Sequence, residues 1–167
     1  MVKAAHYRLL FYNDQGVLDP IKLSRQLGIH INTVKKYLRL LEREGFVKGT
    51  DYGDYRITDR GWRFIDSLKK VLTKKEKPPY ILTDPSTGQP VPLSINNYEQ
   101  LYIAVKHGLV SKEILDEHLR RGYLVEWFKN ALGDEFLVEK IRRGEIKGID
   151  DLVKYLEKII DLSRDVH

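Results

Sequence analysis

The side chains with the clearest chemical potential lie between positions 32 and 43. This segment has no carboxylate before Glu42 and is otherwise rich in amide, hydroxyl and cationic groups: Asn32, Thr33, Lys35, Lys36, Tyr37, Arg39 and Arg43. Groups of these types contact phosphate oxygens and base edges in a DNA major groove. The plainer interpretation is the solvated face of an amphipathic helix, and the segment taken alone fits both.

Residues 19–41 contain the elements that would position this face. Asp19 is a favourable N-cap, and Pro20 suits the first helical position, where no backbone N–H is needed. Gly28 is placed to turn the chain before a second helix over 31–43. That helix has one apolar stripe, formed by Val34, Leu38 and Leu41. The spacing predicts a helix-turn-helix.

The flanking segments predict a small sheet around this motif. Gly45 is suited to end the second helix, and Thr58 with Asp59 is suited to begin another helix that runs to about residue 72. The remaining elements expected in this half are a helix over 4–12, a short strand at 17–18, and two strands over 46–50 and 55–58 that are joined by a turn at 51–54.

Charge is distributed unevenly along the 167 residues. The net charge is +5, but residues 1–77 carry 17 Lys and Arg against 9 Asp and Glu, whereas residues 78–167 carry 12 against 15. The basic half is therefore the half with the helix-turn-helix, as expected of a nucleic-acid-binding segment.

Two segments in this half carry a known family pattern. LSRQLGIHINTVKKYLRLLEREGFVKG contains the helix, the glycine turn and the second helix, and YRITDRGWRFID contains a strand followed by a Thr-x-x-Gly helix start. Residues 5–72 thereby resemble the winged helix-turn-helix transcriptional regulators of archaea and bacteria, which include the multiple-antibiotic-resistance and phenolic-acid regulator types. The resemblance implies that the helix 31–43 enters the major groove and that the hairpin, or wing, approaches the backbone or the minor groove.

The resemblance also assigns contacts to positions of this sequence. The implied base contacts are Asn32, Thr33, Lys36 and Tyr37, and the implied backbone contacts are Lys35, Arg39, Arg43, Lys48 and Arg56. Two features depart from the family pattern. His30 replaces the usual Ser or Thr cap, so we expect a looser helix start or a cap through Asn32. Asp51 and Asp54 replace basic residues at the wing tip, which disfavours phosphate contact there.

The second half is expected to be a separate helical domain. Residues 73–79 have the composition of a linker, and their lysines could form an additional phosphate-binding arm or a solvated spacer. Residues 80–83 and 89–93 predict a hairpin, and glycine-punctuated short helices follow. Residues 118–141 weakly resemble a small helical module of uncharacterised archaeal proteins, which implies no activity.

Two apolar sets in the second half each allow two interpretations. The first set could form the core or line an effector pocket, with core favoured: Tyr98, Tyr102, Tyr123, Trp127, Phe128 and Phe136. The second set lies on the last helix and could be a dimer interface, which we predict, or part of the core: Leu152, Leu156, Ile159 and Ile160, with Tyr155 at its edge.

The expected fold class is mainly α with a small β-wing. We expect an N-terminal winged helix-turn-helix over 1–72, a linker over 73–79, and a C-terminal helical domain with a short hairpin over 80–167. The expected function is sequence-specific binding of double-stranded DNA by a transcriptional regulator, acting as a homodimer. A winged-helix protein-protein adaptor in transcription or replication machinery is the alternative, and a nucleic-acid-processing enzyme is a weaker one.

Several classes of function have no support in the sequence. There is no cysteine, no apolar run long enough to span a bilayer, and no spacing of residues typical of a catalytic or metal site. We therefore expect no enzyme activity, no cofactor, no metal and no membrane partner. A cytoplasmic, nucleoid-associated location is expected, and the C-terminal domain is expected to bind a protein partner or a small effector.

Overall fold

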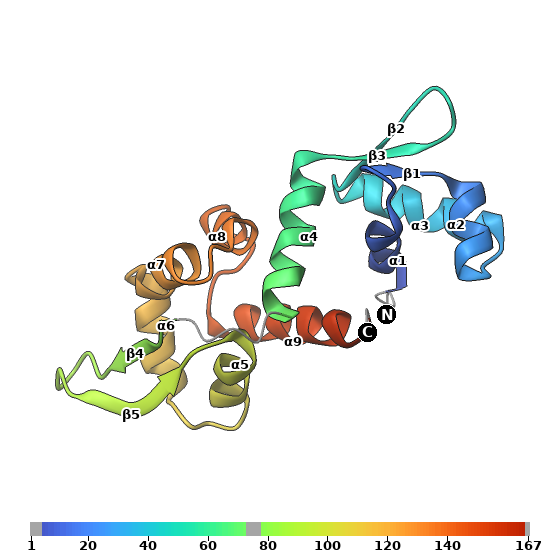
Figure 1. Cartoon of the computed structure of the whole chain (residues 1–167). Helices are drawn as coiled ribbons and strands as arrows, with labels where there is room; N and C mark the ends of the chain where they lie inside the picture. Colours follow the sequence, from blue (N-terminus) through green and yellow to red (C-terminus); the bar gives the residue numbers. More distant parts are fainter. Residues whose placement is uncertain (1–4, 73–77, 166–167) are drawn as a thin grey trace. The chain divides into compact units, whose positions relative to one another are not determined.

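The computed structural model of this protein describes residues 5–72 and 78–165, and they divide into two compact units (Figure 1). Unit 1 comprises residues 1–66 with the last four residues of the chain, and unit 2 comprises residues 67–163. The division lies inside helix α4 (Asp59–Leu72), upstream of the boundary at residue 72 that the sequence suggests. The end of α4 contributes to unit 2 because Ser67 donates a 2.8 Å hydrogen bond to Asp134. Most of the expected linker, residues 73–77, lies outside the described residues.

Unit 1 has the element order expected of a winged helix. The sheet order is β1-β3-β2, with both pairs antiparallel, so the first strand completes the sheet formed by the hairpin. The elements before α4 are α1 (Ala5–Arg8), the 3₁₀ helix η1 (Leu9–Tyr12), β1 (Val17–Leu18), α2 (Pro20–Leu27), α3 (Ile31–Arg43), β2 (Val47–Gly49) and β3 (Tyr55–Ile57).

The helix boundaries follow from local hydrogen bonding. The Asp19 side chain accepts a 2.8 Å hydrogen bond from the Ile21 N–H, and Gly28 ends α2 with φ of 63°, a left-handed conformation that glycine adopts without steric cost. His30 itself caps α3, because its Nδ1 accepts from the Asn32 N–H at 3.2 Å. The cap through the Asn32 side chain that the sequence left open is therefore not used.

A close backbone approach joins the wing to α4. The Thr58 hydroxyl accepts from the Gly61 N–H at 3.1 Å and donates to the Gly45 carbonyl oxygen at 2.5 Å. A Cβ on Gly61 would lie 2.1 Å from the Phe46 carbonyl oxygen, so only glycine fits this position. The Thr-x-x-Gly pattern thus fixes the start of α4 against the end of α3.

The core of unit 1 lies between the helices and one face of the sheet. The stripe of α3 is fully buried, and the rings of Phe46 and Phe64 stack with their centroids 4.5 Å apart. Other apolar side chains that are at most 4 % exposed in this core are Tyr7, Leu9, Leu10, Leu18, Leu23, Val47 and Ile65.

Unit 2 is a hairpin followed by helices, as the sequence predicts. Asn97, Ser111 and Asp134 each cap the helix that follows them, by accepting a backbone N–H three residues later. The last helix begins at Ile149. The elements are β4 (Tyr80–Thr83), β5 (Pro90–Ile95), α5 (Tyr98–Lys106), α6 (Lys112–Arg120), α7 (Tyr123–Asn130), α8 (Glu135–Arg142) and α9 (Ile149–Asp165).

The apolar stripe of α9 is core, and its prediction as a dimer interface is wrong. A single chain already buries all of its members to 6 % exposure or less: Leu152, Leu156, Ile159 and Ile160. Side chains buried in one chain cannot also form a solvent-facing contact surface. Most of the aromatic set is core as well, since Tyr98, Trp127, Phe128 and Phe136 are buried, whereas Tyr123 is 48 % exposed.

Buried tyrosine hydroxyls stabilise both units. In unit 2, Tyr98 donates to the buried Asp134 at 2.6 Å, and the Tyr80 hydroxyl contacts Nδ1 of the buried His118. In unit 1, Tyr7 donates to Glu44 at 2.9 Å. Burial raises the pKa of all three phenols well above the usual range, and the adjacent carboxylates add to the rise for Tyr7 and Tyr98.

Candidate nucleic-acid interface

Helix α3 presents a polar, cationic face opposite its buried stripe. Asn32, Lys36, Arg39 and Arg43 recur at intervals of four, three and four residues, which places them on one side of the helix. All four are exposed, whereas Val34, Leu38 and Leu41 on the opposite side have no exposed surface. We call these four residues the α3 outer face. It carries three cations and an amide.

The other predicted contacts of this helix lie on its two flanks. Thr33 and Tyr37 are half-buried, and the Tyr37 ring lies 6.4 Å from the ring of His6 in α1. Lys35 lies on the other flank, which adjoins the wing tip. The structure therefore separates the predicted base contacts: Asn32 and Lys36 are on the outer face, and Thr33 and Tyr37 are on the flank near α1.

The wing runs along the second flank of α3. The Glu42 carboxylate accepts a 2.9 Å hydrogen bond from the N–H of Gly49, the last residue of β2, and the wing tip borders Lys35 about two turns earlier in the helix. Glu42 is thus occupied by the wing rather than placed on the outer face. The α3 outer face and the wing are held in a fixed relation within unit 1.

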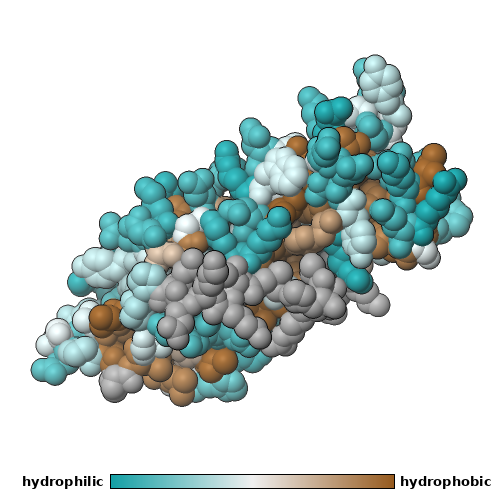
Figure 2. All heavy atoms as spheres, viewed as in Figure 1, coloured by the Kyte–Doolittle hydropathy of each residue, from teal (hydrophilic) through white to brown (hydrophobic). Residues whose placement is uncertain are grey.

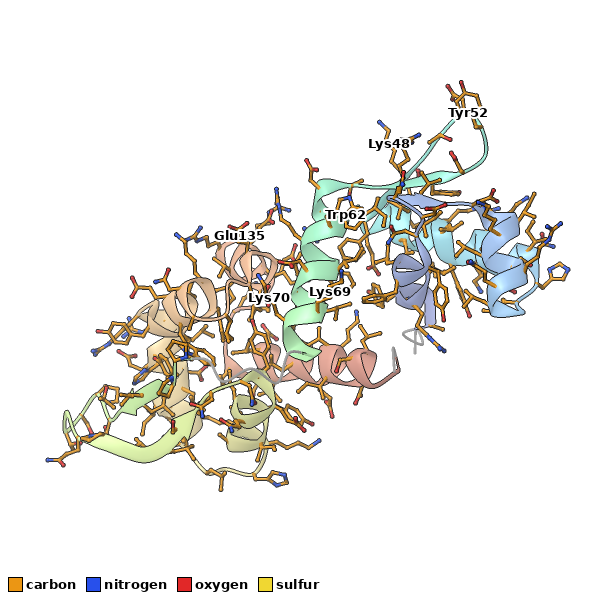
Figure 3. All side chains as sticks on the ribbon, in the orientation of Figure 1. Lys48, Tyr52, Trp62, Lys69, Lys70 and Glu135 are labelled. Atoms are coloured by element: carbon orange, nitrogen blue, oxygen red, sulfur yellow. The ribbon has the colours of Figure 1, made fainter. Side chains whose placement is uncertain are left out.

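Two cations lie opposite each other on the wing. Lys48 and Arg56 are Cα partners in the β2–β3 ladder, and both are exposed, while the next pair, Val47 and Ile57, faces the core. Figure 3 shows Lys48 projecting away from the helices of unit 1. A like-charged pair in direct opposition is unfavourable in the free protein and becomes favourable when an anion binds between the charges.

The wing tip carries an aromatic residue that the contact assignment from sequence missed. Tyr52 is 95 % exposed at the end of the loop between β2 and β3 (Figure 3). Of the two tip carboxylates, Asp54 is half-buried and bonded to the Thr50 hydroxyl, whereas Asp51 is exposed. The available signal was a tyrosine in a loop of Asp and Gly, where no core can cover it.

Comparison with known proteins agrees with this geometry. Residues 8–76 match the protein family described as winged helix-turn-helix. The N-terminal part of this chain is a winged helix-turn-helix domain. Such a domain indicates DNA binding, and the fold class and the resemblance expected from the sequence are confirmed.

A relative extends the similarity beyond the winged helix-turn-helix domain. The chain is 26 % identical over 141 residues to an uncharacterized protein of Methanocaldococcus jannaschii, a match that covers 80 % of this chain and 49 % of the relative. The chain thus spans about half the length of that relative. No solved structure matches the chain.

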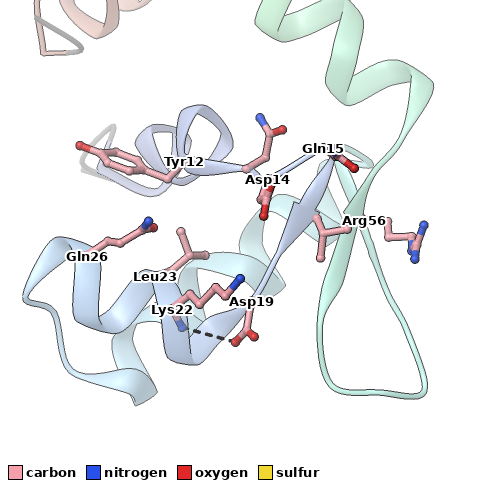
Figure 4. A pocket seen from close by; sticks show the side chains of 10 residues that line it. Tyr12, Asp14, Gln15, Asp19, Lys22, Leu23, Gln26 and Arg56 are labelled. Carbon is pink, nitrogen blue, oxygen red and sulfur yellow. Dashed lines mark hydrogen bonds between the residues drawn. The ribbon is translucent and has the colours of Figure 1, made fainter.

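A cleft of the winged helix-turn-helix domain lies beside β1 and α2. It has a volume of about 670 Å³ and is bordered by charged groups of both signs (Figure 4). Its border carries two carboxylates, Asp14 and Asp19, and two cations, Lys22 and Arg56. The Asp19 side chain already accepts the Lys22 N–H as the cap of α2. This balance gives no preference for an anion, so the cationic surfaces remain the α3 outer face and the wing.

Other kinds of site find no support in the described residues. Across 5–72 and 78–165, no group of three or more His, Cys, Asp or Glu side chains is placed to hold a metal ion. No helix within the same residues is long and apolar enough to cross a membrane.

Proposed function

We propose that this protein is a sequence-specific, double-stranded DNA-binding transcriptional regulator that reads the major groove with α3. The α3 outer face carries this proposal, because it is exposed, contains three cations and an amide, and has no carboxylate. Helix α3 has 13 residues, which gives it a length of about 20 Å. An α-helix with its side chains is about 10–12 Å across, so it fits a major groove about 12 Å wide.

Each part of the surface has a distinct proposed role. Asn32 and Lys36 lie early on the outer face and are proposed to contact base edges, whereas Arg39 and Arg43 contact phosphates. Lys48 and Arg56 hold the backbone from the wing. The flank residue Lys35 joins the backbone contacts, and the roles of Thr33 and Tyr37 remain predictions.

We propose that the regulator acts as a homodimer. One recognition helix covers only a few base pairs, and two helices about 34 Å apart read a site of useful length. Because the α9 stripe is core, the dimer surface must lie elsewhere. Helix α4 offers Trp62, which remains 42 % exposed, and light scattering of the wild type and of Trp62→Ala tests this placement.

The second unit is proposed to have a regulatory rather than a catalytic role. It would bind a protein partner or a small effector, without a cofactor, in a cytoplasmic, nucleoid-associated protein. The acidic balance of residues 78–167 supports this division, because such a unit is poorly suited to hold DNA itself.

Selection of bound genomic fragments by the purified full-length chain tests the main proposal. We expect an enriched sequence motif and binding that weakens with salt, at a log–log slope of about −0.9 for each phosphate contact. Lys36→Gln with Arg39→Gln should abolish enrichment, whereas Lys129→Gln with Lys154→Gln in unit 2 is the charge-matched control. Absence of duplex binding even at low salt would reject the proposal and favour the protein-protein adaptor.

A further inference from the structure

A groove of about 310 Å³ lies within the winged helix-turn-helix domain, between the wing tip and the starts of α2 and α3. The proposed function leaves this groove without a role. Its lining is largely apolar on the helix side and aromatic at the tip, and its main side chains are Pro20, Ile21, Ile31, Lys35, Tyr52 and Asp54.

Two large side chains at this groove are exposed to solvent. Tyr52 is 95 % exposed and Ile21 is 53 % exposed. Among the described residues, Tyr52 is the most exposed large apolar side chain, and the tip that carries it projects clear of its surroundings in Figure 2. Exposed apolar surface around a concave site is typical of a binding position.

The loop that carries Tyr52 is preorganised by its own hydrogen bonds. The Thr50 N–H donates to the Asp54 carbonyl oxygen at 2.9 Å, and the Thr50 hydroxyl bonds to the Asp54 carboxylate. These bonds close the loop without using the Tyr52 ring. A ligand that contacts the ring therefore meets a preorganised tip, which lowers the entropic cost of binding.

The charge balance of the groove lining disfavours a phosphate inside the groove and favours a flat, neutral group. Asp19 and Asp54 border the groove against the single cation Lys35, and the exposed Asp51 precedes Tyr52. Carboxylates so placed repel phosphate oxygens on either wall of a narrow minor groove. A nucleobase has no charge, stacks on aromatic rings, and presents donors and acceptors at its edge.

The groove also lies beside the surface proposed to hold the DNA. Lys35 lines the groove, and its neighbour Lys36 belongs to the α3 outer face. A base that leaves the helical stack next to the bound backbone would reach the groove without crossing the cationic face. This step rests on the proposed function.

We infer that this groove binds an unpaired nucleobase of the DNA held by α3. Tyr52 stacks on the base, Ile21 contacts it from the helix side, and the polar groups of the groove face its edge. The protein therefore prefers DNA with unpaired bases beside the contacted duplex over fully paired DNA of the same sequence.

Two DNA molecules of one sequence test the inference with the full-length protein. One is fully paired, and the other has a short central run of mismatched bases that contains 2-aminopurine. We expect the wild type to bind the mismatched DNA at least about fivefold more tightly, the lower range for one stacked base. We also expect it to quench the 2-aminopurine fluorescence.

Variants at the groove and at the outer face separate the two proposals. Tyr52→Ala should lose the preference and the quenching while keeping duplex affinity, and Tyr52→Phe should keep all three. Lys36→Gln should weaken binding to both DNA molecules but retain quenching at saturation. Duplex binding without a preference, or a preference that survives in Tyr52→Ala, overturns the inference alone. Binding of mismatched DNA without duplex binding overturns the proposed function instead, and absence of binding to either DNA overturns both.

Discussion

Lys48 and Arg56 lie directly opposite each other across the β2–β3 ladder, with both side chains exposed on the same face of the wing. Like charges in direct opposition destabilise an antiparallel pair by an amount similar to what opposite charges contribute, roughly 0.2–1 kcal/mol. The wing therefore retains a locally unfavourable arrangement that an anion between the two side chains would relieve.

Neutralising one member of this pair should affect stability and binding in opposite directions. Lys48→Gln is expected to raise the free energy of unfolding by up to about 1 kcal/mol, because the repulsion with Arg56 is removed. It should weaken binding to specific and random duplexes alike, because a backbone contact carries no sequence information. Denaturant titration and fluorescence anisotropy measure the two effects. A loss of stability in Lys48→Gln would contradict the argument.

Residues early on the α3 outer face should affect sequence preference. Asn32→Ala and Lys36→Ala are each expected to reduce the discrimination between the selected motif and random DNA by roughly 1–3 kcal/mol. Lys129→Ala is the control in unit 2, and it should leave discrimination unchanged because Lys129 is exposed outside the winged helix-turn-helix domain. Equal losses on both DNA molecules for Asn32→Ala and Lys36→Ala would show that α3 does not read bases.

The contact between Gly61 and the Phe46 carbonyl oxygen predicts a large loss of stability on substitution. In Gly61→Ala the new Cβ would lie 2.1 Å from that oxygen and 2.7 Å from the Ile57 side chain, so the backbone must move. We expect a loss of at least about 2 kcal/mol in the free energy of unfolding of the N-terminal unit. Gly49→Ala is the control, because its nearest contact would be an ordinary 3.4 Å.

Charges introduced into the α9 stripe should unfold the second unit. Leu156→Asp with Ile160→Asp would bury two unpaired carboxylates, at a cost of several kcal/mol. Circular dichroism is expected to show loss of helix and of cooperative unfolding. Lys154→Asp places a carboxylate at an exposed position of the same helix and should remain folded. A folded, monomeric double variant would instead restore the interface interpretation.

The buried phenols predict a loss of stability at alkaline pH. The pKa values of Tyr7, Tyr80 and Tyr98 are raised in the folded state above the ordinary value of 10.0, first of all by burial. As pH rises past that value, the unfolded chain loses these protons while the native protein keeps them. The stabilisation is therefore complete below about pH 10 and is lost above it.

Urea unfolding as a function of pH measures this effect. Tyr98→Phe should flatten the decline of the unfolding free energy above about pH 10, although it also lowers stability at neutral pH by removing a hydrogen bond to Asp134. Tyr52→Phe is the control, since that ring is 95 % exposed. An unchanged alkaline slope in Tyr98→Phe would contradict the assignment.

The sequence by itself determined the local elements of this protein. Asp19, Gly28 and the spacing of the α3 stripe specify where helices begin, end and turn, because caps and left-handed glycines act within a few residues of one another. The same locality explains why the hairpin and the short helices of unit 2 agree with expectation. The concentration of positive charge in residues 1–77 was also evident from the sequence, because counting charged residues requires no knowledge of their contacts.

Only the tertiary structure decided which faces are available. The apolar stripe of α9 has the same pattern whether a neighbouring element or a second chain covers it, and burial within one chain settles the choice for core. Likewise, Tyr37 and Lys36 are adjacent in sequence, yet α1 half-covers the first and leaves the second exposed. The groove at Tyr52 and Ile21 joins residues far apart in the chain, so no local spacing could reveal it. Periodicity specifies the side of a helix on which a residue lies, but only the packing of distant segments determines what that side meets.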